Sequence, residues 1–308
     1  MTEEQQKTGQ QYTSVSIVYG DLGSEYYGIQ TLGTNVNYGK MKDKGFTLED
    51  LELCKANFEK IGCECDIIHL NPELINATKG TTEFEVKAAK TQQAYVLRVK
   101  NAVNSIYNAA AASEADANHD TLLREQLGHN WDKQGFMYGR VVNKKARFHL
   151  SYADTARDPD YENGKGRIVA WNDVPLTSKL HLLLPQYIPN CGVLDCEANQ
   201  YEDVTKYSGI GFHGDTERRK VIVVKLGCVT PVHFHWFFGA KPIGNNIEIP
   251  LDHGDLYIMS EKTAGTDWKS RGIFSLRHAC GAKKFTTVTS GDDEENKKKK
   301  RKFGGYKK

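Results

Sequence analysis

Two side chains that could bind a metal ion stand two positions apart, at His213 and Asp215. Residues i and i+2 of a strand point to the same side, so one strand and its turn could present an imidazole and a carboxylate together. Non-haem iron oxygenases hold Fe(II) with two histidines and one carboxylate and leave other positions open. The pair therefore predicts two of three ligands. On its own it is a weak signal, because a solvent-exposed turn can carry it by chance.

Further segments surround this pair in a fixed order. They are residues 144–147 (KKAR) followed by 152–154 (YAD), 199–201 (NQY), 221–227 (VIVVKLG) and 251–259 (LDHGDLYIM). In this order, and together with the His-x-Asp pair, they resemble the AlkB family of Fe(II)/2-oxoglutarate-dependent dioxygenases. The resemblance extends over residues 139–289, about half of the chain, and does not cover the first 130 residues. It implies a double-stranded β-helix, or jelly-roll, core.

The resemblance also implies roles for particular residues. His213 and Asp215 would bind Fe(II), Asn199 and Tyr201 would contact 2-oxoglutarate, and O2 would be the cosubstrate. The implied reaction is oxidative demethylation or hydroxylation of modified bases in DNA or RNA, which such enzymes take as flipped-out or single-stranded nucleotides. The residues expected to bind this substrate are Lys144, Arg147, Tyr152, Glu217 and Arg218.

The third metal ligand is open to two interpretations, because residues 268–270 (WKS) stand where the family carries its second histidine. In the first, His278 is the ligand, Lys284 begins a strand (KFTTVT) and pairs with the distal carboxylate of 2-oxoglutarate, and Arg277 has a secondary role near the cosubstrate. In the second, Arg271 and Arg277 take the places of the family's two C-terminal arginines. We favour His278, because the second interpretation leaves the metal one ligand short.

The elements that must position these residues change character along the chain. From residue 136, short strand-like runs follow one another between Gly, Pro, Asn and Asp, which is typical of a sandwich or barrel. Helical and strand patterns alternate before that point. The expected class is α+β, with residues 1–12 disordered, 13–130 an N-terminal α/β extension or lid, 131–290 the jelly-roll core and 291–308 a disordered basic tail. Before residue 130 we expect strands at 14–19, 65–70 and 94–99, and helices at 47–60, capped by Thr47, and 102–112.

Composition limits where the protein acts. The 308 residues are 39% hydrophobic and 26% charged, which is ordinary for a globular protein. There is no apolar run long enough to span a membrane and no apolar secretory signal. The seven cysteines form no CxxC pair, so a zinc ribbon is not indicated, and reduced thiols fit a nuclear or cytoplasmic location. We expect a monomer with no membrane partner.

The net charge of +2 hides an asymmetry. Residues 297–308 carry eight positive charges and no negative one, which leaves −6 for the rest of the chain. The tail could attract nucleic acid without sequence preference or act as a nuclear localisation signal. The acidic body argues against a nucleic acid substrate, because a phosphate track needs a basic face, and one alternative function is a 2-oxoglutarate hydroxylase of a protein or small molecule. The missing upstream histidine favours another, an inactive relative that binds nucleic acid without turnover.

Overall fold

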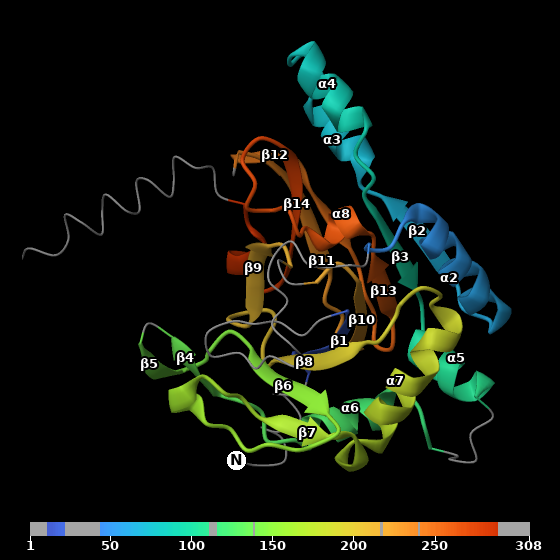
Figure 1. Ribbon diagram of the computed structural model, residues 1–308, viewed down its shortest axis with the longest axis vertical. Coiled ribbons are helices and arrows are strands. Elements are labelled where there is room, and N and C mark those ends of the chain that lie inside the picture. The colour runs from blue at the N-terminus through green and yellow to red at the C-terminus, as the bar shows by residue number, and fades with distance from the viewer. Residues whose placement is uncertain are drawn as a thin grey trace, which may run out of the picture.

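The computed structural model describes residues 11–21, 44–110, 116–137, 139–215, 218–239 and 241–288. Over these residues the protein is a mixed α+β structure with an eight-stranded main sheet, a four-stranded small sheet and a separate two-stranded hairpin (Figure 1). Neighbouring strands are antiparallel, except for the parallel pair β6 and β7.

The order of strands in the main sheet is β2 (Cys65–His69), β3 (Tyr95–Val99), β13 (Leu256–Met259), β10 (Val221–Gly227), β1 (Ser14–Gly20), β8 (Asp195–Tyr201), β6 (Phe148–Ala153) and β7 (Ile168–Ala170). The order in the small sheet is β12 (Lys241–Ile249), β11 (Val232–Phe238), β14 (Phe274–Gly281) and β9 (Gly209–His213). The hairpin consists of β4 (Gln134–Met137) and β5 (Arg140–Asn143).

Most of the longer helices lie on one side of the sheets (Figure 1), and none among the described residues is both long and apolar enough to cross a membrane. They are α2 (Leu48–Lys60), α3 (Asn71–Ala77), α4 (Glu83–Lys90), α5 (Ala102–Ala109), α6 (His119–Leu127), α7 (Pro175–Tyr187), α8 (Glu261–Ala264) and α9 (Lys283–Thr286), with short 3-10 turns η1 (Tyr161–Asn163) and η2 (Trp171–Asp173).

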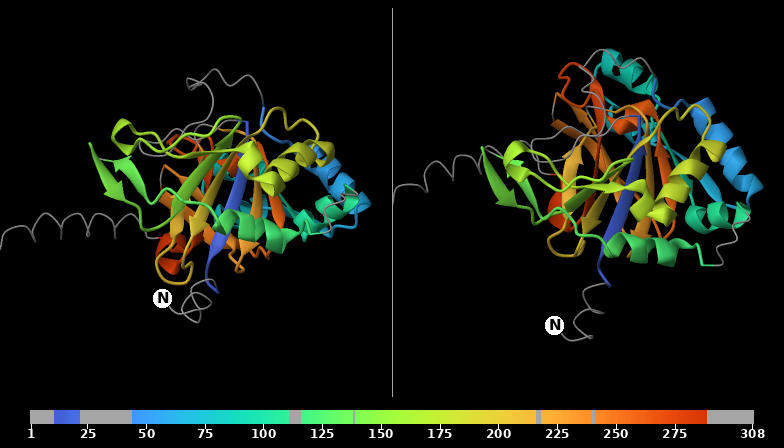
Figure 2. Two further views of the ribbon diagram at one scale, coloured as in Figure 1. Left: turned by 90° about the horizontal axis from the view of Figure 1, so that it is seen from below. Right: turned by 60° about the horizontal axis from the view of Figure 1, so that its bottom comes forward.

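The main sheet is buried on both faces, which explains the almost unbroken apolar run of β10. Ile222, Val224 and Leu226 belong to one hydrophobic cluster, which they share with buried residues of α2, α5, α6 and α7. Val221 and Val223 belong to a second cluster, which they share with β11 and β14 of the small sheet. Helices α2, α5, α6 and α7 therefore cover one face (Figure 2), and the small sheet covers part of the other.

The N-terminal strand β1 lies inside the main sheet. It pairs with β10 on one side and β8 on the other, so that Ser16 is opposite both Lys225 and Asn199. Strands β2 and β3 extend the same sheet beyond β13. Residues 13–130, expected to form an extension or lid, thus supply three strands of the main sheet and share its core.

Two local expectations have opposite outcomes. The helix start at Thr47 is confirmed, because the Thr47 side chain accepts from the Asp50 N–H and Asp50 reaches back to the Thr47 N–H. The strand expected to begin at Lys284 is wrong, because Lys283–Thr286 form helix α9. Phe285 of this helix packs so closely on Gly209 of β9 that a Cβ at Gly209 would lie 2.5 Å from its ring.

Candidate metal centre

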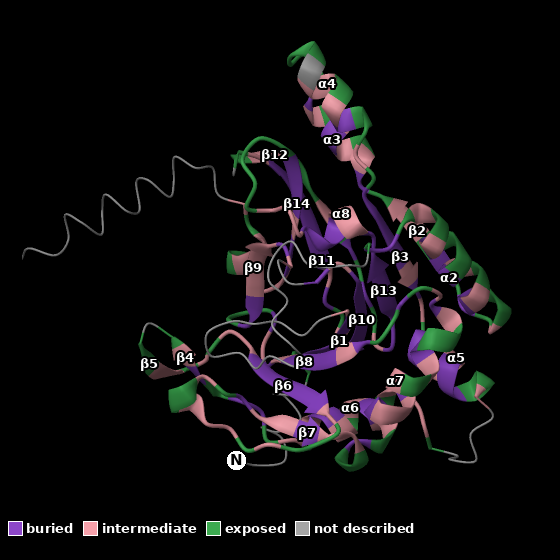
Figure 3. Cartoon of the chain, viewed as in Figure 1, coloured by how far each residue is buried: buried purple, intermediate pink, exposed green. Residues whose placement is uncertain are grey.

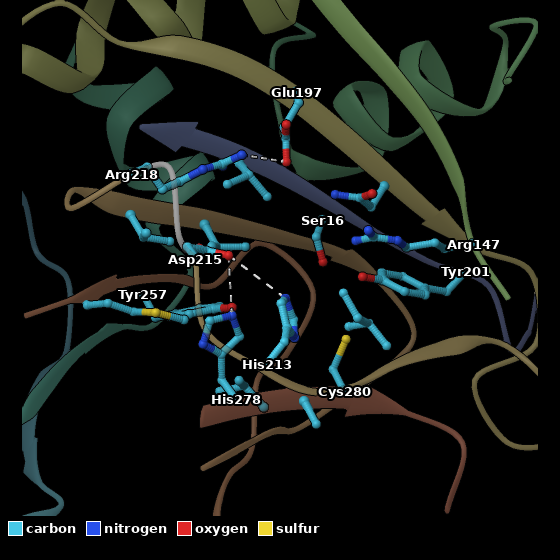
Figure 4. A pocket seen from close by; sticks show the side chains of 18 residues that line it. Ser16, Arg147, Glu197, Tyr201, His213, Asp215, Arg218, Tyr257, His278 and Cys280 are labelled. Carbon is cyan, nitrogen blue, oxygen red and sulfur yellow. Dashed lines mark ion pairs between the residues drawn. The ribbon is translucent and has the colours of Figure 1, made fainter. Parts of the chain in front are cut away.

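His213, Asp215 and His278 converge on one cavity (Figure 4). The Nε2 atoms of both histidines lie 3.8 Å from the same Oδ1 of Asp215, and the three ligand atoms are all within 4.8 Å of one another. A separation of 3.8 Å is too long for a hydrogen bond. It is short enough for one ion, with bonds of about 2 Å, to touch all three atoms. This donor set fits a two-histidine, one-carboxylate iron site.

The small sheet and a tight loop place these ligands. His213 ends β9 and is opposite His278 of the neighbouring strand β14. The chain then turns through Gly214, where a Cβ would lie 2.1 Å from the Gly265 carbonyl oxygen. The Asp215 N–H donates to the Ala264 carbonyl at 2.8 Å and fixes the carboxylate beside the two rings. The position between the two ligands therefore requires glycine.

His213 is held in the tautomer that a metal requires. Its Nδ1 lies 2.8 Å from the Gly211 carbonyl oxygen. A carbonyl only accepts, so Nδ1 carries the proton and Nε2 keeps its lone pair toward Asp215. Burial lowers the pKa of His213 to about 3 and the pKa of His278 to about 4. Both imidazoles are therefore neutral near pH 7, which is the form that binds metals.

The cavity lies between the two sheets and encloses about 70 Å³. One water needs roughly 10–15 Å³ on a comparable measure, so the cavity has room for a small molecule. Most of its lining comes from the inward-facing residues of β1, β8, β10 and β13 on one side and of β9, β11 and β14 on the other. The aliphatic part of the lining is Val18, Ile210, Val221, Val223, Val232, Met259 and Ala279.

Two further cations stand at the cavity: Arg147 lines it, and Lys225 is hydrogen-bonded to the lining residue Ser16. Arg147 points into the cavity near Ser16 and Tyr201 (Figure 4). The buried Lys225 ammonium donates to the Ser14 hydroxyl at 3.1 Å and to the Ser16 hydroxyl at 2.9 Å. Among the residues that the structure describes, neither cation forms an ion pair with a carboxylate, although the charge of Arg147 helps to lower the pKa of Glu197. An anionic group would therefore be stabilised beside Arg147 and Tyr201.

A buried ion pair forms another part of the cavity wall. The Arg218 Nη2 atom lies 3.0 Å from Glu197 Oε1, and the two side chains are only 3% and 11% exposed. Burial alone would raise the pKa of Glu197, but the charge of Arg218 and its hydrogen bond, together with other nearby positive charge that includes Arg147, outweigh it, and the pKa falls to about 2. Glu197 is therefore ionised, and Arg218 does not lie on the surface as the expected phosphate contact would require.

Three other side chains could also hold a metal ion by their spacing, namely His119, Asp120 and His253. Hydrogen bonds to His253 account for this cluster without a metal. The Gly227 N–H donates to His253 Nδ1 at 3.1 Å. The proton of this ring is therefore on Nε2, which donates to Asp120 Oδ1 at 3.1 Å. Nε2 has no lone pair to offer a metal in this tautomer, which is the opposite of the arrangement at His213.

The predicted cosubstrate contacts divide into two groups. Asn199 and Tyr201 line the cavity as expected. Lys284 is exposed on α9 and is not among the lining residues. Arg277 precedes His278 in β14 and points to the opposite face, with its guanidinium 4.0 Å from the centre of the Phe237 ring. The cosubstrate roles expected of Lys284 and Arg277 therefore do not fit the structure.

The expected substrate contacts are also divided, because only two of them line the cavity: Arg147, from the segment before β6, and Arg218, which is paired with Glu197. Tyr152 is 1% exposed in the core, where its hydroxyl donates to Gln126 at 2.6 Å, so it is not free to bind a substrate. Lys144 is half-buried outside the cavity, and burial lowers its pKa to about 8. Glu217 lies outside the described residues.

Sequence reasoning missed Ser16, Glu197 and Lys225. Glu197 had a signal, because it precedes Asn199 and Tyr201 at the two-residue spacing that puts alternate strand residues on one face. Lys225 interrupts the apolar run of β10, which marks it as a buried polar residue in need of partners. Ser16 had no signal, because nothing local links it to strands about 200 positions away.

These features describe a mixed α+β protein with a histidine–aspartate–histidine cluster in a cavity between two sheets. The chain is 35% identical over 272 residues to "Uncharacterized protein R156" of Acanthamoeba polyphaga mimivirus, and the alignment covers 88% of this chain and 97% of the viral protein. The chain belongs to the same family as this viral protein. No protein-family model matches the sequence.

Proposed function

We propose that the protein is an Fe(II)- and 2-oxoglutarate-dependent dioxygenase with an AlkB-like jelly-roll core, acting on modified bases in nucleic acid. The observation that carries the proposal is the donor set of His213, Asp215 and His278, which faces a cavity that also contains the cation Arg147. Two facing sheets with this cavity between them support the jelly-roll assignment.

The three ligands would hold Fe(II), which with 2-oxoglutarate and O2 supplies the oxidation of a substrate C–H bond to C–OH, with release of succinate and CO2. Arg147 would neutralise the far carboxylate of 2-oxoglutarate. Burial raises the pKa of Tyr201, so its hydroxyl stays protonated and would donate a hydrogen bond to that carboxylate. The apolar lining would exclude water from the reacting atoms.

The inner face of the main sheet would orient the cosubstrate. Asn199 Oδ1 lies 3.4 Å from His149 Nδ1, and His149 Nε2 lies 3.2 Å from the Ser151 hydroxyl. Burial lowers the pKa of His149 to about 4, so this ring is neutral near pH 7. The chain of contacts fixes the Asn199 amide, whose donor group would be available to a cosubstrate oxygen.

The test is turnover by the full chain with Fe(II), 2-oxoglutarate and O2. Succinate should form, and single-stranded oligonucleotides with N-methylated bases should release formaldehyde, because a hydroxylated N-methyl group breaks down to formaldehyde and the free amine. Asp215→Ala is the control that should form neither product. Succinate without formaldehyde would redirect the search to proteins or small molecules, and failure to bind Fe(II) would end the dioxygenase proposal.

A further inference from the structure

The hairpin of β4 and β5 belongs to neither the main sheet nor the small sheet, and it projects from the side of the molecule near β9 (Figure 1). Its four residue pairs run from Gln134 with Asn143 to Met137 with Arg140. Much of its surface is exposed (Figure 3). A short hairpin of this kind gains little stability from its own packing. Its exposed side chains are therefore not needed for the core and can contact a partner.

The hairpin and the segment after it carry only positive charge. Residues 133–147 contain five cations and no acidic residue, in a chain whose body without the tail is acidic. Lys133 forms an ion pair with Glu202, whose Oε1 atom lies 3.7 Å from the Lys133 ammonium nitrogen. Arg140 and Lys145 are exposed and have no carboxylate partner within the part of the chain that the structure describes. They are therefore available to an anionic partner.

The positive segment leads into the candidate active site. The cations continue from Arg140 in β5 to Lys145 and then to Arg147, whose guanidinium points into the cavity (Figure 4). Phe136 is half-buried and Met137 is exposed beside these charges. Cations that follow a backbone, next to an aromatic ring on which a base can stack, are the combination that proteins use for single-stranded nucleic acid.

We propose that the β4–β5 hairpin is a docking surface for the phosphate backbone of single-stranded DNA or RNA, with Arg140 and Lys145 as phosphate contacts. The inference deepens the proposed function, since a strand held here would present a base to the cavity beside Arg147. The site favours the single-stranded form, because a stacked base within a duplex would first have to be flipped out to reach a cavity between two sheets.

The experiment measures binding of a fluorescent single-stranded oligonucleotide to the full chain without metal or cosubstrate, over a series of salt concentrations. The test variant is Arg140→Glu with Lys145→Glu. The matched control is Lys87→Glu with Lys90→Glu, two exposed lysines on α4 at the far end of the molecule in Figure 1. Both variants change the net charge equally and keep the basic tail. Each phosphate contact on a single strand contributes about 0.7 to the salt slope, so the hairpin variant should lose about 1.4 from the slope.

The expected result is a loss of affinity of about tenfold or more at low salt in the hairpin variant, with the control close to the unchanged protein. Photocrosslinking should also place oligonucleotide adducts within residues 134–147. Equal losses in the two variants would assign binding to net charge or to the tail and overturn the proposal. Preferential binding to vesicles containing phosphatidylserine would overturn it as well, in favour of a membrane. Failure of the oxygenase chemistry would not alter these binding results.

Discussion

The ammonium group of Lys225 donates a 2.9 Å hydrogen bond to the hydroxyl of Ser16, and this contact joins β10 to the N-terminal strand β1 beside the candidate active site. Burial lowers the pKa of Lys225, so the serine hydroxyls of β1 are needed to stabilise its charged form. The cavity wall and the core of the main sheet therefore both depend on a strand that begins at residue 14.

Removal of residues 1–20 should abolish cooperative folding. The deletion takes out the strand between β8 and β10, together with the fully buried side chains of Val15, Ile17 and Tyr19, and leaves two rows of backbone groups without partners. Removal of residues 1–10 alone is the control and should be tolerated. Circular dichroism during heating and gel filtration would compare the two. A cooperative transition at an unchanged Tm in the longer deletion would show that β1 is dispensable.

Removal of one metal ligand should abolish metal binding without unfolding the protein. His278→Ala leaves Asp215 with a single histidine, and loss of a ligand should weaken Fe(II) binding by more than the roughly 10–100-fold that loss of an outer hydrogen-bond partner costs. Succinate production should fall with it. His253→Ala is the matched control, because that imidazole belongs to the hydrogen-bonded group with Asp120. Calorimetry with Fe(II) under anaerobic conditions would measure both, and equal affinities would refute the assigned donor set.

The cation that binds the cosubstrate should be Arg147 and not Lys284. Arg147→Gln removes the guanidinium that points into the cavity. The KM for 2-oxoglutarate should rise by about 10- to 100-fold, since a hydrogen bond to a charged group contributes about 1.5–3 kcal/mol. Lys284→Gln changes an exposed residue of α9 and should leave the KM within about twofold. If the KM rose in Lys284→Gln and not in Arg147→Gln, the interpretation in which Lys284 pairs with the distal carboxylate of 2-oxoglutarate would be restored.

Local patterns predicted the local parts of this site and failed where distant segments meet. The His-x-Asp spacing and the alternation of Asn199 with Tyr201 are strand properties that a sequence displays directly. The cosubstrate role expected of Lys284 required a further strand after β14 that would pair within the sheet. Which strands pair with one another cannot be read from the residues of a single strand. The cations that line the cavity come from other segments, at Arg147 before β6 and Arg218 before β10. The helices were missed after residue 130, where α7 interrupts a region rich in strand patterns.

Loss of the Glu197 carboxylate should destabilise the protein and flatten its response to acid. Glu197→Gln leaves the buried Arg218 without its 3.0 Å partner, and breaking a buried pair in this way costs about 3–5 kcal/mol in the free energy of unfolding at pH 7. The exposed pair of Arg167 with Asp158, whose carboxylate side chain is 91% exposed, offers a matched control. Asp158→Asn should cost less than about 1 kcal/mol. Urea denaturation at pH 7 would compare the two variants.

The same carboxylate sets the direction of the pH dependence. The pKa of Glu197 is about 2 in the folded protein against a usual value of 4.5. A depressed pKa contributes stability that is fully present above about pH 4.5 and is lost as the pH falls toward 2, because the unfolded chain takes up the proton first. The difference between the two pKa values corresponds to about 3 kcal/mol. Between pH 5 and 2, the free energy of unfolding should therefore fall more steeply in the unchanged protein than in Glu197→Gln. Parallel curves over that range would mean that Glu197 has an ordinary pKa and that Arg218 does not hold it ionised.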